Sequence, residues 1–470
     1  MPVAQTSAIP PRFAGADAAS LPLYIIAEDE LAAFLQGAGA SHSAWLQASG
    51  FDASLGALRL LPGPGGISGA VAGLGSAKSR QRQRFGLARA ASALPEGTVW
   101  HFATELPDDL AAEAALAWLL AAYRFDRYRP GKKPADPARL KAPANIDAPR
   151  IEAMVAGECL TRDLINTPAR DMGPDQLEAA FRELAAAHGA HVKVITGEDL
   201  ISQNFPLIHA VGQASPRAPR LLDLHWGNQG PRLTLVGKGV CFDTGGLDIK
   251  PANGMLLMKK DMGGAATTMG LAKMIMALNL PIRLRLLVPA VENVIAGNAQ
   301  KPKDIVTSRK GLTVEINDTD AEGRLVLADA LALATEEETD LLISMATLTG
   351  AARIAVGPDL APYWAQDDAT ALALERGAKS GFDPVWRMPF HTPYEPVIEP
   401  GIADLDNAPG FGFAGAITAA LFLRRFADHP RYMHFDIYGH TPTDAPARPK
   451  GGAGQGARAI LNALPDMLGL

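Results

Sequence analysis

The chain has 470 residues, of which 48% are hydrophobic and 20% charged, with a formal net charge of −6 and a sequence pI of about 6.0. This length predicts two or three domains, and the composition is ordinary for a globular protein with sizeable cores, which excludes a disordered chain. The acidic balance gives no general attraction to nucleic acid or to anionic lipid, so neither is expected as a partner.

The first 125 residues alternate between short strand and helix patterns. The apolar window 110–125 contains Glu113 and is shorter than the roughly 20 residues that a membrane span requires, so we expect a buried helix there. The alternation predicts a small α/β domain, with strands at 22–27 and 98–103 and helices at 29–36 and 108–125.

Residues 128–150 contain five prolines and mixed charge, which is typical of an extended connector. We therefore expect an N-terminal α/β domain over residues 1–145 and a second, larger domain over 146–470.

Two further features concern the cellular compartment. Residues 1–20 lack the basic and apolar regions of a secretory signal. Cys159 and Cys241 are the two cysteines of the chain, which is too few for a disulfide framework. Both observations predict a cytoplasmic protein.

The larger domain shows longer elements in alternation. Strand and helix in turn over this length predict an α/β domain with a largely parallel sheet flanked by helices, in which ligands bind where strands end. The predicted strands are 191–196, 220–226, 232–240, 282–290, 312–316, 341–348 and 432–439, and the predicted helices are 151–166, 175–188, 263–278, one after residue 322, 414–427 and one from about 455.

Charged side chains gather at one such strand end, in residues 235–266. Lys238 and Asp243 follow a strand, Lys250 follows a Gly-Gly loop, and Asp261 precedes a Gly-Gly helix start. These residues form the first candidate cluster.

The second cluster is the stretch "INDTDAEGRLVLADAL", residues 316–331. Asp318, Asp320 and Glu322 are two residues apart, so in extended backbone they face the same side. Converging carboxylates repel each other unless they are solvated or a cation lies among them, and a pair of divalent ions about 3.5–4 Å apart is one candidate. Acids before a helix also serve as caps and dipole partners, so the spacing alone leaves both interpretations open.

Other motifs in the sequence give weaker evidence of function. A phosphate-binding P-loop needs glycine where Arg232 stands and a hydroxyl residue where Gly239 stands, and no His-Glu-x-x-His pair is present. Cys241 is better explained as a small buried residue than as a nucleophile, and "KSRQRQR" at 78–84 as a solvated helix face.

Several long motifs resemble the leucyl (cytosol) aminopeptidases, a family of two-metal exopeptidases. The family signature Asn-Thr-Asp-Ala-Glu-Gly-Arg-Leu is matched by "DTDAEGRL" except at its first position. The resemblance is convincing over residues 150–470 and only in outline over the first 145. Its other motifs are "VGKGVCFDTGGLDIKP" (236–251), "MKKDMGGAA" (258–266), "RDLINTPARDMGP" (162–174), "ATLTGA" (346–351) and "GFAGAITAALFL" (412–423).

The resemblance implies a metal-binding role for five residues. Asp243 and Glu322 would bridge two divalent ions, Asp320 would hold the looser ion, and Lys238 and Asp261 the tighter one. A metal-bound lysine must be neutral, so Lys238 would need a strongly lowered pKa. Oxygen and amine ligands without thiolate suit Mn²⁺ or Zn²⁺ and do not choose between them.

The resemblance also implies two catalytic residues, Lys250 and Arg324. Lys250 would stabilise negative charge on the scissile carbonyl oxygen, and Arg324 would hold a bicarbonate-like anion that relays protons. Backbone groups of Gly323 and Leu348 would help to position that anion. The family's pocket for the first side chain of the substrate corresponds to Met258, Thr347 and Gly350.

The implied activity is release of N-terminal residues, leucine-like or other, from peptides with a free N-terminus, by attack of a metal-bridging hydroxide. The implied fold is a small N-terminal α/β domain and a larger catalytic α/β domain with a mixed, largely parallel sheet, assembled as a homohexamer. Two alternatives are a same-fold regulatory protein that binds DNA and a dipeptidase of the Cys-Gly type.

The sequence departs from the family pattern in three places. Asp318 stands where the family usually has Asn, and Leu256 where Asp commonly follows Met255. The stretch "HFDIYGHTPTDAPARP" (434–449) differs from the commoner "DIAGT" form and is similar to a bacterial branch with a longer loop. Because that loop lies near the substrate pocket in relatives, a preference for leucine does not follow from the resemblance.

Overall fold

The computed structural model describes residues 9–129 and 136–470 and divides into two compact units. The smaller unit runs to Ala156 and includes Thr443–Lys450, and the larger contains Gly157–Pro442 and Gly451–Leu470. The division falls within helix α6 (Ala148–Asn166), so the boundary expected near residue 145 remains a proposal. Residues 130–135 of the expected connector, and residues 1–8 of the stretch tested for a signal, lie outside the described residues.

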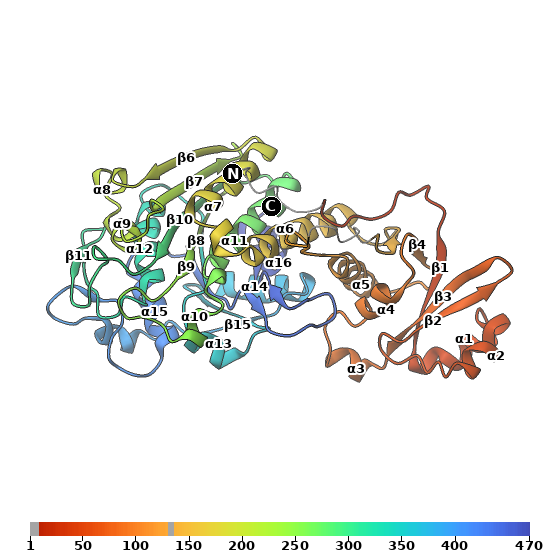
Figure 1. Cartoon of the computed structure of the whole chain (residues 1–470). Helices are drawn as coiled ribbons and strands as arrows, with labels where there is room; N and C mark the ends of the chain where they lie inside the picture. Colours follow the sequence, from red (N-terminus) through yellow and green to blue (C-terminus); the bar gives the residue numbers. More distant parts are fainter. Residues whose placement is uncertain (1–8, 130–135) are drawn as a thin grey trace. The chain divides into compact units, whose positions relative to one another are not determined.

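The smaller unit is an α/β domain with a five-stranded sheet, in which the strand order is β2-β3-β1-β4-β5 (Figure 1). The predicted strand at 22–27 is β1, and it lies between two parallel neighbours, while β2 is antiparallel to β3. Its strands are β1 (Leu21–Ala27), β2 (Leu58–Gly63), β3 (Gly66–Gly75), β4 (Val99–Phe102) and β5 (Arg139–Leu140), and its helices are α1 (Leu31–Gln36), α2 (Ser43–Ala48), α3 (Ala77–Gln81), α4 (Ala88–Ala93) and α5 (Asp108–Ala121).

Helix α5 forms from the apolar window of the sequence at residues 110–125. It buries a continuous run of side chains, and the indole of Trp118 donates a hydrogen bond to the carbonyl of Ala138 at 2.8 Å. Among the described residues, no helix has both the length and the apolar character needed to cross a bilayer. The hydrophobic window is therefore used for packing within the unit.

The larger unit is built on a nine-stranded mixed sheet, as expected. Five of its strand pairs are parallel and three antiparallel. The order is β15-β14-β17-β13-β8-β10-β7-β6, with β9 beside β10. The strands are β6 (His191–Thr196), β7 (Arg220–Trp226), β8 (Arg232–Gly237), β9 (Gly239–Asp243), β10 (Arg283–Asn293), β13 (Leu341–Ala346), β14 (Ala361–Ala365), β15 (Val385–Arg387) and β17 (Tyr432–Asp436).

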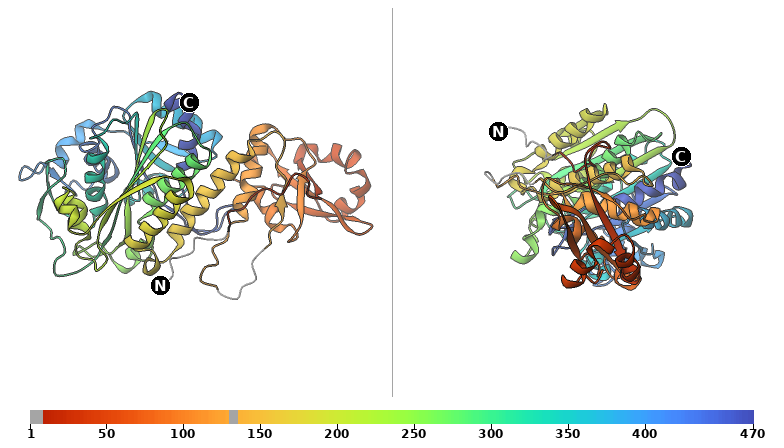
Figure 2. Two further views of the ribbon diagram at one scale, coloured as in Figure 1. Left: turned by 90° about the horizontal axis from the view of Figure 1, so that it is seen from above. Right: turned by 90° about the vertical axis from the view of Figure 1, so that its right-hand side faces the viewer.

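Helices cover both faces of this sheet (Figure 2). Besides the second half of α6, the α-helices of this unit are α7 (Pro174–His188), α8 (Asp199–Ser202), α9 (Pro206–Gly212), α10 (Ala252–Met255), α11 (Gly263–Ala277), α12 (Glu322–Ala334), α13 (Gly350–Val356), α14 (Asp368–Ser380), α15 (Gly415–Arg424) and α16 (Ala457–Leu468). Smaller sheets pair β11 (Ile305–Thr307), β12 (Thr313–Glu315) and β16 (Leu405–Asp406), and β18 (His440–Thr441) with β19 (Gly451–Gly452).

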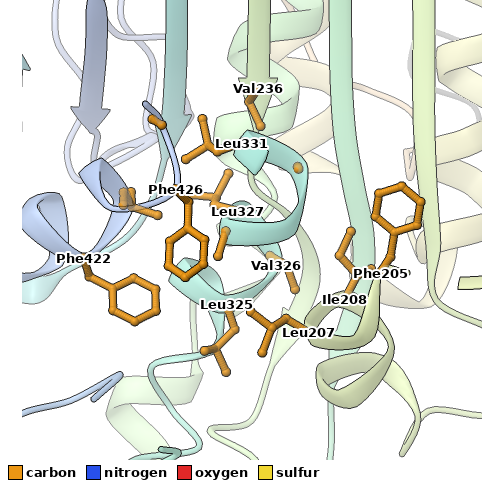
Figure 3. Packing of buried hydrophobic residues seen from close by; sticks show 14 of the residues in the cluster. Phe205, Leu207, Ile208, Val236, Leu325, Val326, Leu327, Leu331, Phe422 and Phe426 are labelled. Atoms are coloured by element: carbon orange, nitrogen blue, oxygen red, sulfur yellow. The ribbon is translucent and has the colours of Figure 1, made fainter. Parts of the chain in front are cut away.

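The alternation of side chains along β8 decides which helix lies on which face. A Cβ on Gly237 would lie 2.3 Å from the hydroxyl oxygen of Thr268, so α11 approaches the backbone closely there. The preceding residue, Val236, faces the other way and packs with Leu327 and Leu331 of α12 (Figure 3). Helix α12 is thus fixed by a fully buried core, and its first residue is held in place by that packing.

The stretch predicted as one strand at 232–240 is two strands with a break at Lys238. The backbone N–H of Lys238 donates to the carbonyl of Met345 at 3.0 Å, and its carbonyl accepts from Ala265 at 2.8 Å. These bonds satisfy the backbone outside the ladder. Lys238 lies at this break, directly after β8.

Candidate metal centre

The predicted site residues meet at the carboxyl ends of central strands. Lys238 follows β8, Asp243 ends β9, and Glu322 begins α12. Asp320 lies two residues before that helix, and Asp261 lies between the 3₁₀ helix η4 (Met258–Lys260) and α11. Ligands of α/β proteins bind at this end of the sheet, beyond the carboxyl ends of the strands.

Three carboxylates converge at this end of the sheet. One oxygen from each of Asp243, Asp320 and Glu322 lies within 4.8 Å of the other two. Burial, and then the charge of Asp243, raise the pKa of Glu322 well above its usual range and that of Asp320 to about 6. The arrangement is costly for anions alone and calls for positive charge among them.

Lys238 supplies positive charge on one side of the carboxylates. Its Nζ lies 2.7 Å from Asp261 Oδ2 and 2.9 Å from Glu322 Oε1, and donates to the carbonyl of Thr347 at 3.2 Å. Burial acts to lower the pKa of Lys238, but the charges of Asp261 and Glu322 outweigh it and raise the pKa overall. The lowered pKa that the resemblance implies would require further cations here and remains a prediction.

Gly323 permits this close packing. A Cβ at this position would lie 2.5 Å from Cε and 2.6 Å from Nζ of Lys238. Only a residue without a side chain can therefore follow Glu322 while Lys238 keeps its position. The structure places Gly323 against the lysine in this way, and its proposed contact with an anion stays a prediction.

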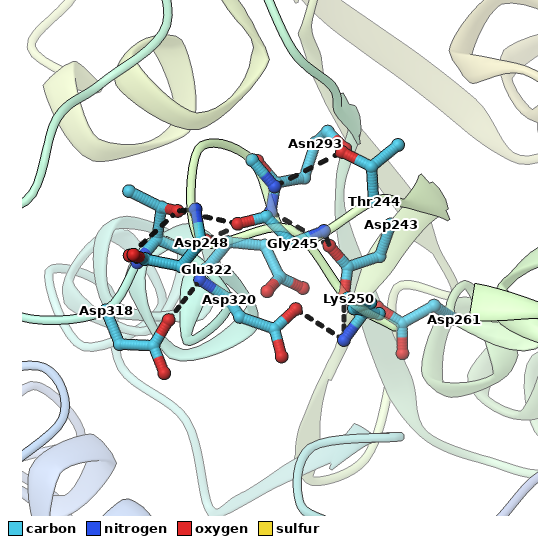
Figure 4. A network of polar contacts seen from close by, with 12 residues as sticks. Asp243, Thr244, Gly245, Asp248, Lys250, Asp261, Asn293, Asp318, Asp320 and Glu322 are labelled. Atoms are coloured by element: carbon cyan, nitrogen blue, oxygen red, sulfur yellow. Dashed lines mark hydrogen bonds and ion pairs between the residues drawn. The ribbon is translucent and has the colours of Figure 1, made fainter. Parts of the chain in front are cut away.

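Lys250 supplies positive charge on the other side (Figure 4). Its Nζ lies 2.8 Å from Asp243 Oδ2 and forms an ion pair with Asp320 Oδ1. Burial acts to lower the pKa of Lys250, but the charge of Asp243 and the two contacts raise it overall. Lys250 also follows the turn at Gly245, whose φ of +88° suits glycine.

Asn293 orients Asp243 and has no counterpart in the sequence prediction. Its amide donates to Asp243 Oδ1 at 2.8 Å and to the carbonyl of Thr319 at 3.0 Å (Figure 4). The backbone N–H of Gly245 also donates to Asp243 Oδ1, at 2.8 Å. The predicted strand stops at residue 290, whereas β10 continues to Asn293, so the sequence prediction did not place this residue at a strand end.

Asp318 differs from the other two acids of its motif. Its Oδ1 accepts a hydrogen bond from the backbone N–H of Asp320 at 2.8 Å, and its carbonyl accepts from the amide of Asn407 at 2.7 Å. Asp318 is not part of the three-carboxylate group found among the described residues. Its side chain closes the turn that presents Asp320.

Arg324 is buried beside this turn. One of its Nη atoms donates to the carbonyl of Asn407, while its buried Nε has no hydrogen-bond partner among the described residues. Burial lowers the pKa of Arg324, with the charges of Asp436 and Glu322 acting in the opposite direction. An unsatisfied buried guanidinium donor is suited to an anion.

Asp436, at the end of β17, holds the loop after β13 and was not predicted as a site residue. It accepts hydrogen bonds from the backbone N–H of Leu348 at 2.9 Å and of Thr349 at 3.0 Å, and from the Thr349 hydroxyl at 2.5 Å. Burial raises the pKa of Asp436 to about 6. Because the N–H of Leu348 already donates to Asp436, the anion contact implied for Leu348 remains a prediction.

The three residues of the expected substrate pocket lie in three separate segments. Met258 begins η4 and is half-buried, Thr347 follows β13, and Gly350 begins α13 and is exposed. The Thr347 hydroxyl donates to Asp261 Oδ1 at 2.8 Å, which connects the pocket to the carboxylates. Burial lowers the pKa of nearby Lys260 to about 8.

The donor set fits divalent cations. Among the described residues, the buried oxygens Asp261 Oδ2, Asp320 Oδ1 and Glu322 Oε1 have no partner other than the lysine ammonium groups with which they form ion pairs. Carboxylate oxygens with an amine nitrogen and no thiolate are ligands that Mn²⁺ or Zn²⁺ accepts. The chain therefore brings together a set of donors that fits these ions.

Comparisons with known proteins agree with this geometry. The model of the cytosol aminopeptidase family catalytic domain matches residues 159–461, and that of the M17 aminopeptidase N-terminal domain matches residues 21–143. The probable cytosol aminopeptidase of Roseiflexus castenholzii is 39% identical over 379 residues, which cover 77% of this chain and 78% of the relative.

Two solved structures are similar over nearly the whole chain. The crystal structure of the cytosol aminopeptidase from Coxiella burnetii has a TM-score of 0.89 at 42% identity and covers 96% of this chain and 98% of its own. The bottromycin maturation enzyme BotP in complex with Mn has a TM-score of 0.85 at 29% identity, covering 95% and 99%.

Matches of this extent across both units place the protein among the metal-dependent aminopeptidases, which hydrolyse peptide bonds. The chain belongs to the cytosol aminopeptidase family, as the motifs in its sequence predict.

Proposed function

We propose that this aminopeptidase uses two divalent ions, held by Lys238, Asp243, Asp261, Asp320 and Glu322. The observation that carries the proposal is the convergence of three carboxylate oxygens within 4.8 Å of one another. When bound, the two ions supply an acidified water and polarise the scissile bond. BotP was solved with Mn, which supports Mn²⁺ as one of the two candidate metals beside Zn²⁺.

Lys250 is proposed to act on the substrate carbonyl. Its ammonium lies beside Asp243 and Asp320, at the rim of the cluster, and remains partly exposed with 15% of its side chain accessible. A positive group at this position stabilises negative charge that develops on the carbonyl oxygen. Lys250 therefore does not need to serve as a metal ligand.

Arg324 is proposed to hold a bicarbonate-like anion. Its buried Nε has no hydrogen-bond partner in the part of the chain that the structure describes, and its charge offsets that of an anion beside acidic neighbours. Such an anion can accept and return a proton during the reaction. Gly323 and Leu348 flank the same position in the proposal.

The pocket of Met258, Thr347 and Gly350 is proposed to receive the first side chain of a peptide with a free N-terminus. As in the family resemblance, we propose a homohexamer that acts in the cytoplasm. The relatives named as cytosol aminopeptidases support the compartment.

Removal and return of metal test this proposal. Chelation should abolish cleavage of leucyl p-nitroanilide and of a panel of other aminoacyl and Cys-Gly dipeptide substrates, and Mn²⁺ or Zn²⁺ should restore it. Metal analysis of the restored protein should give two ions per chain. Absence of activity on every aminoacyl substrate, with two ions verified in place, would contradict the proposal.

A further inference from the structure

Two basic side chains adjoin the proposed pocket for the first substrate residue. Lys260 ends the same 3₁₀ helix that Met258 begins. Arg353 lies in the helix that Gly350 begins, and a Cβ on Gly350 would meet Arg353 Nη2 at 3.9 Å. Each of these two pocket segments therefore carries a cation.

An aromatic ring adjoins the third pocket segment. Tyr438 precedes Gly439, whose added Cβ would lie 3.1 Å from Thr347 Cγ2. Lys260 Nζ lies 5.2 Å and Arg353 Cζ 5.1 Å from the centre of the Tyr438 ring. The ring attracts both cations and brings them together beside the pocket.

Lys260 is buried without an anionic partner. The residue is 6% exposed. In the described part of the chain its ammonium has no hydrogen bond and no carboxylate within ion-pair distance, although the charges of Asp261 and Asp436 act on it from further away. The adjacent Lys259, in contrast, donates to the carbonyl of Asn166 at 2.6 Å. Burying an ammonium without an ion-pair partner is unfavourable, and a π face offsets only part of that cost.

We propose that Lys260, with Arg353 and Tyr438, makes this pocket selective for an acidic first residue, glutamate or aspartate. The inference rests on the proposed function and specifies its substrate class. A substrate carboxylate beside Lys260 would complete the missing ion pair, and the second cation would add to the attraction. Tyr438 lies in the stretch 434–449 that departs from the commoner family form, which is consistent with a changed preference.

The test compares two substrates of nearly equal shape, α-glutamyl and glutaminyl p-nitroanilide, with the metal-loaded enzyme. We expect kcat/KM for the glutamyl substrate to exceed that for the glutaminyl one by about tenfold, the effect of roughly 1.4 kcal/mol. Lys260→Met should bring the ratio of the two kcat/KM values close to one. Arg353→Met should lower it about twofold, because Arg353 is exposed and its charge is screened.

Lys259→Met is the matched control, because it removes a neighbouring lysine that has its own partner, and it should leave the ratio unchanged. If Lys260→Met does not fold, the wild-type ratio and the Arg353→Met ratio decide. An enzyme that cleaves leucyl and glutaminyl substrates at least as well as glutamyl ones overturns the inference and leaves the proposed function in place. An enzyme that cleaves none of them with two ions bound overturns both.

Discussion

Asp318 shows how one position can keep a structural role while changing the charge of a site. Its Oδ1 accepts the backbone N–H of Asp320, and the side-chain oxygen of asparagine, the residue usual in the family, can accept the same bond. The turn therefore tolerates both residues. The difference that remains is one negative charge near the proposed metal ligands.

We predict that Asp318→Asn weakens Mn²⁺ binding by roughly threefold to tenfold, because a nearby carboxylate attracts a divalent cation even through partial screening. Calorimetric titration of the metal-free protein measures this directly. Asp318→Ala is the matched comparison. It removes both the charge and the side-chain hydrogen bond that closes the turn, and it should therefore weaken binding further. Equal Mn²⁺ affinity in wild type and Asp318→Asn would show that the charge has no effect on the metals.

At the scale of elements, β13 and β17 are joined by a buried polar group as well as by their ladder. Ser344 Oγ lies 2.8 Å from His434 Nδ1 and 2.7 Å from the Tyr432 hydroxyl. Nε2 of His434 has no hydrogen-bond partner among the described residues. Burial, and then the charge of Arg324, lower the pKa of His434 to about 3 from its ordinary value of 6.5.

A depressed histidine pKa means that the folded state favours the neutral ring. Its contribution to stability is present above pH 6.5 and is lost as the pH falls towards 3. We predict that the free energy of unfolding of the wild type falls, between pH 6 and pH 4, by about 1.4 kcal/mol per pH unit more than that of His434→Phe. Urea unfolding at each pH gives both slopes, and identical slopes would exclude His434 as the cause. Ser344→Ala serves as a control that keeps the titrating ring.

At the scale of the whole molecule, the proposed homohexamer follows from the family resemblance. Light scattering should give six times the chain mass of 49.5 kDa at micromolar concentration. We expect this mass to persist after chelation if assembly does not depend on the metals. A monomer mass over the whole concentration range would refute the hexamer without affecting the proposed site.

Local patterns predicted much of the larger unit because its elements are long. Helices α7, α11 and α12 and strands β6 and β7 lie where their side-chain periods place them. No predicted element covers β14, α14 or β15, or the hairpin of β2 and β3. Strand β15 has only three residues and β3 is rich in glycine, so neither carries a strong strand pattern.

The sequence by itself determined the residue types of the site, the acids two apart in 318–322 and the family to which the chain belongs. Only the tertiary structure decided that Asn293 orients Asp243, that Asp436 holds the loop at Leu348, and that Lys260 is buried beside Tyr438. The physical reason is that a side-chain period is a property of neighbouring residues. Contacts between segments 50 or 88 residues apart depend on the order in which strands pair in the sheet.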